Sequence, residues 1–486
     1  MVFSSIVFLC MFLPIVCIGY FLLPKQLRNI WLLVFSLLFY AYGEPIYICI
    51  MAFSTIFDYA NGRAIDYCKR KGKKWAKAVL VLSIVGNLGM LGYFKYTDFL
   101  LGSINQMTGS DFSLLSLALP IGISFYTFQT MSYTIDVYLG KVQCQKNFID
   151  FAMYVCFFPQ LIAGPIVKYS CVEHQLKNRN VTLEMAAQGL SRFSIGLGKK
   201  VLLANQAGAL YEQIKGFQDG DWSMAVAWLG AISYMFQIYF DFSGYSDMAI
   251  GLGKIFGFTF PENFNYPYEA KSITEFWRRW HMTLSGWFRE YVYIPLGGNK
   301  KGWKRQIVNL FIVWFLTGLW HGAGWNFVIW GLYYFLFLIL EKGIWNLLGK
   351  RKGEKKSHGK IVGILGNLWK HGYTLVVVWF GWVLFCCEKT DDLLVMVKAI
   401  FGIGVPIWNP VGKFSWLNAL PFLLVLCIAS TSLPQKIAKH VVSNAAKEAL
   451  LYVYSCLLFV ACMAFLIRGS YNPVSYTHLT LPTIRL

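Results

Sequence analysis

Long apolar segments alternate with short polar ones along most of the chain. A helix that crosses a lipid bilayer needs about 20 residues, and several of these segments are shorter or are interrupted by proline or glycine. We therefore predict an all-α integral membrane protein with about 10–12 transmembrane helices, accompanied by re-entrant and amphipathic helices. The apolar segments run over residues 1–23, 29–43, 46–67, 79–94, 117–139, 148–167, 224–240, 307–340, 373–387, 416–429 and 449–467.

Composition and charge agree with a membrane protein. Of the 486 residues, 57% are hydrophobic and 14% are charged, whereas soluble domains carry about 25% charged residues. This composition excludes a disordered protein and a nucleic-acid-binding protein. The net charge of +20 includes basic runs at 69–77, 300–305 and 350–360, which we interpret as cytoplasmic loops.

The ends of the chain receive separate predictions. Residues 1–23 have neither a basic leader nor a small-residue cleavage site, so we interpret them as a retained membrane span and not as a signal peptide. Residues 474–486 show neither amphipathic periodicity nor capping signals, and we interpret them as a non-native tail. The remaining residues, 1–473, are predicted to form a single transmembrane domain.

The longest uncharged segment, 307–340, contains the first candidate site. Its 34 residues would extend about 51 Å as one straight helix, far more than the ~30 Å hydrocarbon core. We expect a break at Gly322-Ala323-Gly324, directly after His321, and close approach of a neighbouring helix at Gly318 and Gly322. Irregular backbone at membrane depth is tolerated where it lines a wet cavity, so we predict that His321 faces one.

His321 has a structural and a functional interpretation. In the structural one it is a buried imidazole that bonds a neighbouring carbonyl group. However, an ionisable group inside a membrane span is a candidate for function by default, and histidine is suited to proton transfer near neutral pH. We therefore favour a catalytic role for His321.

Residues 272–291, SITEFWRRWHMTLSGWFREY, are predicted to form one amphipathic helix. Ser272 and Glu275 have the spacing of a capping box at its start, and Glu275 can pair with Arg279 one turn later. The aromatic residues form two adjacent stripes, one of which contains His281.

This predicted helix also has two interpretations. As a membrane-surface helix, it would extend its arginines toward water. Alternatively, its aromatic face covers a pocket while Arg278 and Arg279 contact the phosphates of an anionic cofactor. The presence of a second histidine, His281, in the aromatic face favours the functional interpretation.

Other chemistry finds little support in the sequence. Asp241 and Asp247 lie on different faces of an apolar segment and are assigned structural roles. No hydrolase, ATPase, zinc or nicotinamide-binding motif occurs in a supporting context, and no metal site is predicted. Any energy must therefore arrive in an activated substrate or an ion gradient.

Three segments carry a resemblance to a known family. They are QLIAGPIVKY at 160–169, YFDFSGYSDMAIGLGKIFGFTFPENFNYPYEAKSITEFWRRWHMTLSGWFREYVYIPLGGN at 239–299 and LTGLWHGAGWNFVIWG at 316–331. In these segments the chain resembles the bacterial membrane-bound O-acyltransferases (MBOAT) of the alginate O-acetyltransferase type. The resemblance extends over essentially the whole chain to about residue 472.

The resemblance implies an MBOAT-type helical bundle around a central funnel, in a multi-pass protein of the bacterial inner (plasma) membrane. It implies that an acetyl group moves from a cytoplasmic thioester donor, acetyl-CoA, across the membrane to an extracytoplasmic polysaccharide, with no bound cofactor. It also implies a partner, an extracytoplasmic acetyltransferase. We further expect the polysaccharide acceptor and membrane lipid as partners, and no nucleic acid.

The family's invariant histidine corresponds to His321, and its second, more variable polar catalytic position corresponds to His281. We expect His321 to act as a general base, while His281 either orients the thioester or polarises its carbonyl group.

Two alternatives stay open. D-alanyl transfer to teichoic acid uses a related scaffold, although the central segment looks more like the acetylating branch. From a different class comes a polysaccharide exporter or proton-coupled transporter, with the histidines as a proton relay. The sequence shows no convincing duplicated half, which weakens this transporter alternative.

Overall fold

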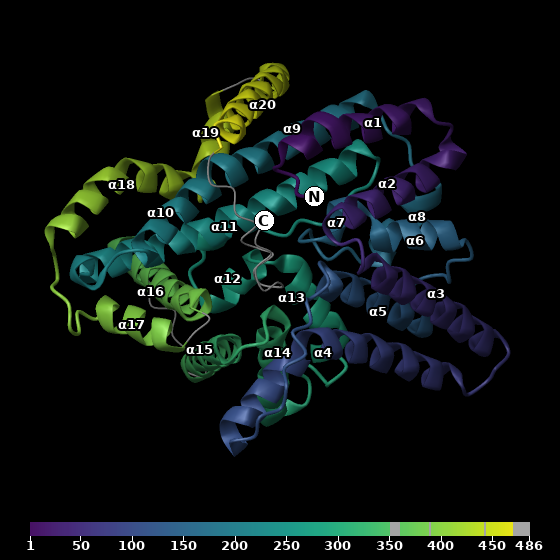
Figure 1. The fold of residues 1–486 in the computed structure, drawn as a ribbon, viewed down its shortest axis with the longest axis horizontal. Coiled ribbons are helices and arrows are strands. Elements are labelled where there is room, and N and C mark those ends of the chain that lie inside the picture. The colour runs from purple at the N-terminus through teal and green to yellow at the C-terminus, as the bar shows by residue number, and fades with distance from the viewer. Residues whose placement is uncertain (350–359, 388–389, 442–443, 470–486) are drawn as a thin grey trace. The chain divides into compact units, whose positions relative to one another are not determined.

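A computed structural model of the chain describes residues 1–349, 360–387, 390–441 and 444–469. All regular elements in these ranges are helices (Figure 1). The all-α prediction is therefore confirmed for this part of the chain. Residues 474–486, which we interpret as a non-native tail, lie outside the described residues.

The residues group into two compact units. The first unit comprises residues 1–201, 242–262 and those from 451 onward, and the second comprises residues 202–241 and 263–450. The long helices α11 (Met224–Ile255) and α20 (Asn444–Ile467) contribute to both units. The single domain expected over 1–473 stays a prediction.

The first unit contains the N-terminal helices, among which α3, α4 and α5 pack against one another. The apolar segment 148–167 is not one helix, because α6 ends at Cys156 and the short α7 follows with Pro159 in its first turn, where a missing N–H is tolerated. The elements are a π-helical turn (Phe8–Phe12), α1 (Leu13–Leu22), a 3₁₀ turn (Lys25–Leu27), α2 (Arg28–Gly43), α3 (Ile48–Arg70), α4 (Ala76–Thr108), α5 (Ile123–Leu139), α6 (Phe148–Cys156), α7 (Phe158–Leu161), α8 (Tyr169–Lys177) and α9 (Leu183–Gly198), which continues into a π-helical segment (Lys199–Ala204).

Two glycine pairs bring α9 and α11 into close contact. A Cβ atom at Gly189 would lie 2.7 Å from the carbonyl oxygen of Gly251, and one at Gly196 would lie 2.6 Å from that of Gly244. The glycines of each helix are seven residues apart and therefore share a face. The order of the pairs makes the two helices antiparallel.

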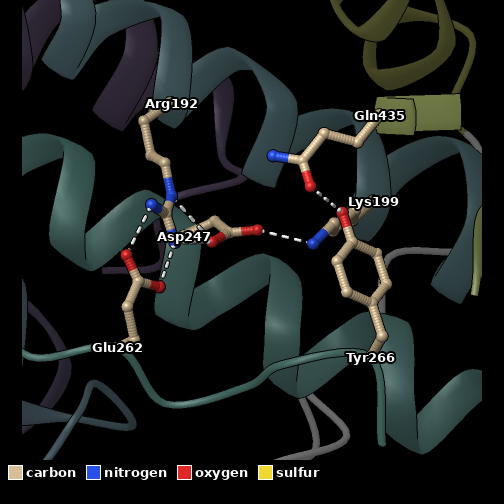
Figure 2. Close-up of polar contacts among 6 residues, drawn as sticks. All are labelled: Arg192, Lys199, Asp247, Glu262, Tyr266 and Gln435. Carbon is tan, nitrogen blue, oxygen red and sulfur yellow. Dashed lines mark hydrogen bonds and ion pairs between the residues drawn. The ribbon is translucent and has the colours of Figure 1, made fainter. Parts of the chain in front are cut away.

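Asp247 lies between these glycines along α11 and anchors an ionic cluster (Figure 2). Its Oδ1 accepts hydrogen bonds from Nε and Nη2 of Arg192 at 2.9 and 2.7 Å, and its Oδ2 accepts one from Nζ of Lys199 at 2.6 Å. Arg192 also donates to both carboxylate oxygens of Glu262, at 2.8 and 2.6 Å. The structural role predicted for Asp247 is confirmed. Asp241 is buried six residues earlier on the unbroken helix.

The second unit contains the helices that hold the candidate residues. They are α10 (Asn205–Lys215), the first part of α11, α12 (Ile273–Arg279), α13 (Met282–Phe288), α14 (Gly302–His321), α15 (Trp325–Gly349), α16 (Lys360–Cys386), α17 (Thr390–Ile400), α18 (Pro410–Ala429) and α19 (Leu433–Val441), with 3₁₀ turns at Asp219–Asp221 and Pro267–Glu269 and a π-helical turn at Arg289–Tyr293.

The break predicted in the segment 307–340 is confirmed. Helix α14 ends at His321, and Gly322 is extended, with φ −168° and ψ 160°. Helix α15 then packs closely on α14, since a Cβ atom at Gly318 would lie 2.5 Å from the carbonyl oxygen of Phe327. A Cβ atom at Gly322 would overlap the ring of the same phenylalanine. The close approach predicted at both glycines is therefore confirmed.

Four described helical segments are long and apolar enough to cross a membrane, namely Ala76–Thr108, Trp325–Ile344, Pro410–Ala429 and Ala449–Ile467. Their large apolar side chains are exposed at many positions, such as Leu417 on α18 and Leu457 on α20. Such a surface is stable when lipid covers it. The larger number of crossings, about 10–12, stays a prediction.

We expect Asp247→Ala to destabilise the first unit, because Lys199 would lose its carboxylate partner at a helix contact and Arg192 would keep only Glu262. Loss of charge-assisted bonds of this kind costs about 2–3 kcal/mol. The melting temperature of detergent-solubilised protein should therefore fall by several degrees. Glu262→Gln is the control, and its effect should be smaller because Glu262 is more exposed. Unchanged melting of Asp247→Ala would contradict a stabilising role.

Candidate functional site

The single amphipathic helix predicted over 272–291 is wrong. The segment forms two short helices, α12 and α13, separated by Trp280 and His281, and then a π-helical turn. The start of α12 agrees in part with the prediction, since Ser272 Oγ accepts from the N–H of Glu275 at 3.0 Å. The carboxylate of Glu275 reaches the N–H of Lys271 instead of that of Ser272, and so completes no capping box.

The helix breaks because an upstream segment takes over its hydrogen bonds. In a continuous helix, the N–H of Thr283 would donate to the carbonyl oxygen of Arg279, four residues earlier. Here the N–H of Asn265 donates to that oxygen at 2.9 Å, and the N–H of Thr283 donates to the side-chain oxygen of Asn263 at 3.3 Å. The N–H of Met282 also donates to the main-chain oxygen of Asn263 at 2.9 Å. The N–H groups of Met282 and Thr283 and the carbonyl oxygen of Arg279 therefore have replacement partners.

His281 lies at this break, buried and in an unusual backbone conformation. Its side chain and main chain are together only 1% exposed, and its φ of 43° places it in the left-handed region. Its Nδ1 lies 3.0 Å from Oδ1 of Asn263. Burial, and to a smaller extent the nearby His321, hold the pKa of His281 well below its ordinary value. The imidazole is therefore neutral at neutral pH.

His321, the last residue of α14, is 6% exposed. Its ring centroid lies 4.9 Å from that of Trp330 on α15, 5.0 Å from that of Trp320 and 5.4 Å from that of Phe385 on α16. Edge-to-face contacts of this kind are favourable and restrict how the ring can turn. The cavity expected beside His321 stays a prediction.

The two histidines belong to one aromatic cluster of the second unit. Trp320 connects them, since its ring contacts both His321 and His281, the latter at 5.9 Å between centroids. Next to burial, His321 is the second cause of the lowered pKa of His281. Further members of the cluster pack around Trp330, and they are Trp277, Trp314, Tyr334, Trp382 and Phe385.

The two arginines predicted to bind phosphate differ in their surroundings. Arg279 is committed within the protein, because it pairs with Glu275 at 2.7 Å, as predicted, and lies 3.9 Å from Glu269. Arg278 is exposed, and no carboxylate of the described residues pairs with it. It lies near enough to Lys342 for the two positive charges to repel each other. Of the two arginines, Arg278 is the better placed to meet an anion.

Sequence reasoning missed the residue that holds His281. Asn263 is fully buried, 18 positions before His281, and lies in a loop. The only available signal was the asparagine-rich motif ENFNY within the family segment, whose pairing with a distant segment is not visible in sequence. Among the described residues, no group of three or more His, Cys, Asp or Glu could hold a metal ion.

Comparisons with known proteins bear on the same segment. The sequence profile of the membrane-bound O-acyltransferase family matches residues 145–387. Over 415 residues the chain is 42% identical to the Pseudomonas aeruginosa protein named "Probable alginate O-acetylase AlgI", which covers 83% of this chain and 75% of that protein. Over 439 residues it is 37% identical to the peptidoglycan O-acetyltransferase of Helicobacter pylori, covering 83% of this chain and 80% of the relative.

A more distant similarity is found with the teichoic acid D-alanyltransferase of Bacillus subtilis. It amounts to 30% identity over 235 residues, which are 44% of this chain and 56% of the relative. The family profile spans both histidines and Asn263. The chain is a membrane protein that belongs to the membrane-bound O-acyltransferase family, and it is an acyltransferase.

Proposed function

We propose that this protein transfers an acetyl group from a cytoplasmic thioester, acetyl-CoA, across the membrane for O-acetylation of an extracytoplasmic polysaccharide. The observation that carries the proposal is that two buried histidines, His281 and His321, contact the same tryptophan, Trp320. Each histidine lies at a break between helices of one unit. Imidazoles in such surroundings are suited to move a proton, which ester formation from a hydroxyl requires.

In the proposed reaction, His321 acts as the general base. It takes the proton of the acceptor hydroxyl, whose oxygen attacks the carbonyl carbon of the thioester. The carbon–sulfur bond then breaks, and the leaving thiolate receives the proton from His321. One ester and one free thiol result, and His321 returns to its neutral form. His281 acts beside it on the orientation of the reacting groups.

The positive charges near α12 support binding of an anionic donor there. The positive charges of Arg278 and Lys342 repel each other, and a bound anion would relieve this repulsion. The phosphates of acetyl-CoA would supply such an anion. Arg279, which already pairs with Glu275 and lies near Glu269, holds α12 in place and contributes less to donor binding.

The names of the relatives support the acceptor class. Two of them are named for acetylation of alginate and of peptidoglycan, both of which carry sugar hydroxyls. Their alignments cover 83% of this chain, whereas that of the D-alanyltransferase covers 44%. This difference favours acetyl over D-alanyl transfer. The family is one of transferases, so a polysaccharide or proton-coupled transporter has less support.

The proposal includes a setting and a partner. The protein would lie in the bacterial inner (plasma) membrane with many crossings, around a funnel that connects the donor side to the acceptor side. Acetyl groups that leave the funnel would pass to an extracytoplasmic acetyltransferase, which modifies the polysaccharide. Membrane lipid would cover the exposed apolar helices.

Replacing His321 should abolish most of the transfer. A general base contributes typically ~10²–10⁴-fold, so His321→Gln and His321→Ala should lower acetyl transfer by at least that order. The measurement is the appearance of labelled O-acetyl ester when vesicles receive labelled acetyl-CoA. His174→Gln, a change at an exposed histidine of α8, is the control. Full activity in a correctly folded His321→Ala protein would remove His321 from the mechanism.

Replacing Arg278 should weaken donor binding more than turnover. Loss of one charge-assisted bond to a phosphate should raise the apparent KM for acetyl-CoA roughly tenfold, with a smaller change in kcat. Steady-state kinetics of Arg278→Ala test this expectation, with Lys177→Ala, at the exposed end of α8, as the control. An unchanged dependence on acetyl-CoA concentration would refute the contact.

A further inference from the structure

Asn263 holds the imidazole of His281 through a single shared oxygen. Oδ1 of Asn263 lies 3.0 Å from Nδ1 of His281, and it accepts from the hydroxyl of Thr283 at 2.8 Å and from the N–H of Thr283 at 3.3 Å. Asn263 is fully buried. Two residues, His281 and Thr283, therefore hold the amide oxygen of Asn263.

These contacts determine which atom of the asparagine faces the histidine. A backbone N–H can only donate, so the Asn263 atom that meets the N–H of Thr283 must be the oxygen. An amide oxygen carries no hydrogen. The hydrogen between Asn263 and His281 must therefore belong to Nδ1 of the imidazole.

The tautomer of His281 follows from this assignment. A neutral imidazole has one N–H, and here it is on Nδ1. Nε2 then carries a lone pair and no proton. A neutral His281 can accept a hydrogen bond or a proton at Nε2, but it cannot donate one there to a thioester carbonyl.

The backbone at His281 is held as tightly as its ring. A left-handed conformation is strained for a residue other than glycine, and it persists where the surrounding contacts impose it. Two main-chain bonds do so, from Asn265 to Arg279 on one side and from Met282 to Asn263 on the other. Asn263 thus binds both the ring of His281 and the backbone next to it.

The charged groups near His281 do not change the assignment of a neutral Nδ1–H tautomer. From α14, His321 acts on it and disfavours a second positive charge. From α12, the guanidinium of Arg279 is neutralised by Glu275 and Glu269. From the loop, Asn263 and Asn265 contribute neutral groups, and α13 carries no titratable side chain.

We propose that Asn263 is a positioning residue of the acyl transfer, which holds His281 as the Nδ1–H tautomer and so makes Nε2 a hydrogen acceptor in the site. This inference rests on the proposed function. Of the two roles expected for His281, it excludes polarisation of the thioester carbonyl by the neutral ring and leaves orientation, which Nε2 would exert by accepting from a substrate N–H or O–H group.

Three variants test the proposal by acetyl transfer from acetyl-CoA. Asn263→Leu removes the acceptor and should lower kcat by about 10²-fold or more, because the imidazole is free to take the wrong tautomer. Asn263→Asp keeps the acceptor and should retain activity at high pH. Thr283→Val removes one bond to the same oxygen without touching His281, and its activity should fall much less.

The pH profile separates positioning from a merely structural role. A carboxylate at 263 would stabilise the protonated imidazole, so the acidic limb of kcat/KM should move to higher pH by about one unit or more. An unmoved limb in active Asn263→Asp would overturn the proposal, as would equal losses in Asn263→Leu and Thr283→Val at matched melting temperatures. A wild-type protein that transfers no acetyl group would instead contradict the proposed function itself.

Discussion

The hydrogen-bond exchange between the segment 263–265 and the segment 279–283 is the constraint on which the candidate site depends. Polar backbone groups in an apolar interior must be paired, and a helix normally pairs its own. Here the helical hydrogen bond from Thr283 to Arg279 is absent. Asn263 accepts from the N–H of Thr283 instead, and Asn265 donates to the carbonyl oxygen of Arg279. These replacement bonds stabilise the break at which His281 lies.

The second break has a different physical origin. Between α14 and α15 the chain turns at Gly322-Ala323-Gly324, and the two helices approach closely at Gly318. No external segment is needed, because glycine presents no side chain to the neighbouring helix. His281 is thus placed by a contact between distant segments, and His321 by a local one. Trp320 contacts both rings.

Some charged side chains of the protein form ion pairs with one another, whereas others can bind a ligand. Asp247, Arg192, Lys199 and Glu262 satisfy one another across the contact of α9 and α11, so they stabilise the fold. Arg279 is committed in the same way. Arg278 instead is exposed and is repelled by another cation, Lys342. This difference explains why, in the proposed donor site, Arg278 binds the phosphates whereas its neighbour Arg279 holds α12 in place.

The sequence by itself determined the features that depend on local pattern and composition. These include the all-helical membrane character, the break after His321 and the pairing of Glu275 with Arg279, because apolar length, glycine position and i,i+4 spacing are properties of neighbouring residues. The family segments also indicated both histidines. The helical periodicity of residues 272–291 wrongly predicted one continuous helix in place of α12 and α13.

Only the tertiary structure decided where that helix breaks and which partner each freed group receives. Asn263 precedes His281 by 18 positions, and no local rule relates the two. The tautomer of His281, its neutral state and the commitment of Arg279 all follow from such distant contacts. A hydrogen bond depends on the positions of two groups in space, and for groups far apart in the chain these positions exist only once the fold has formed.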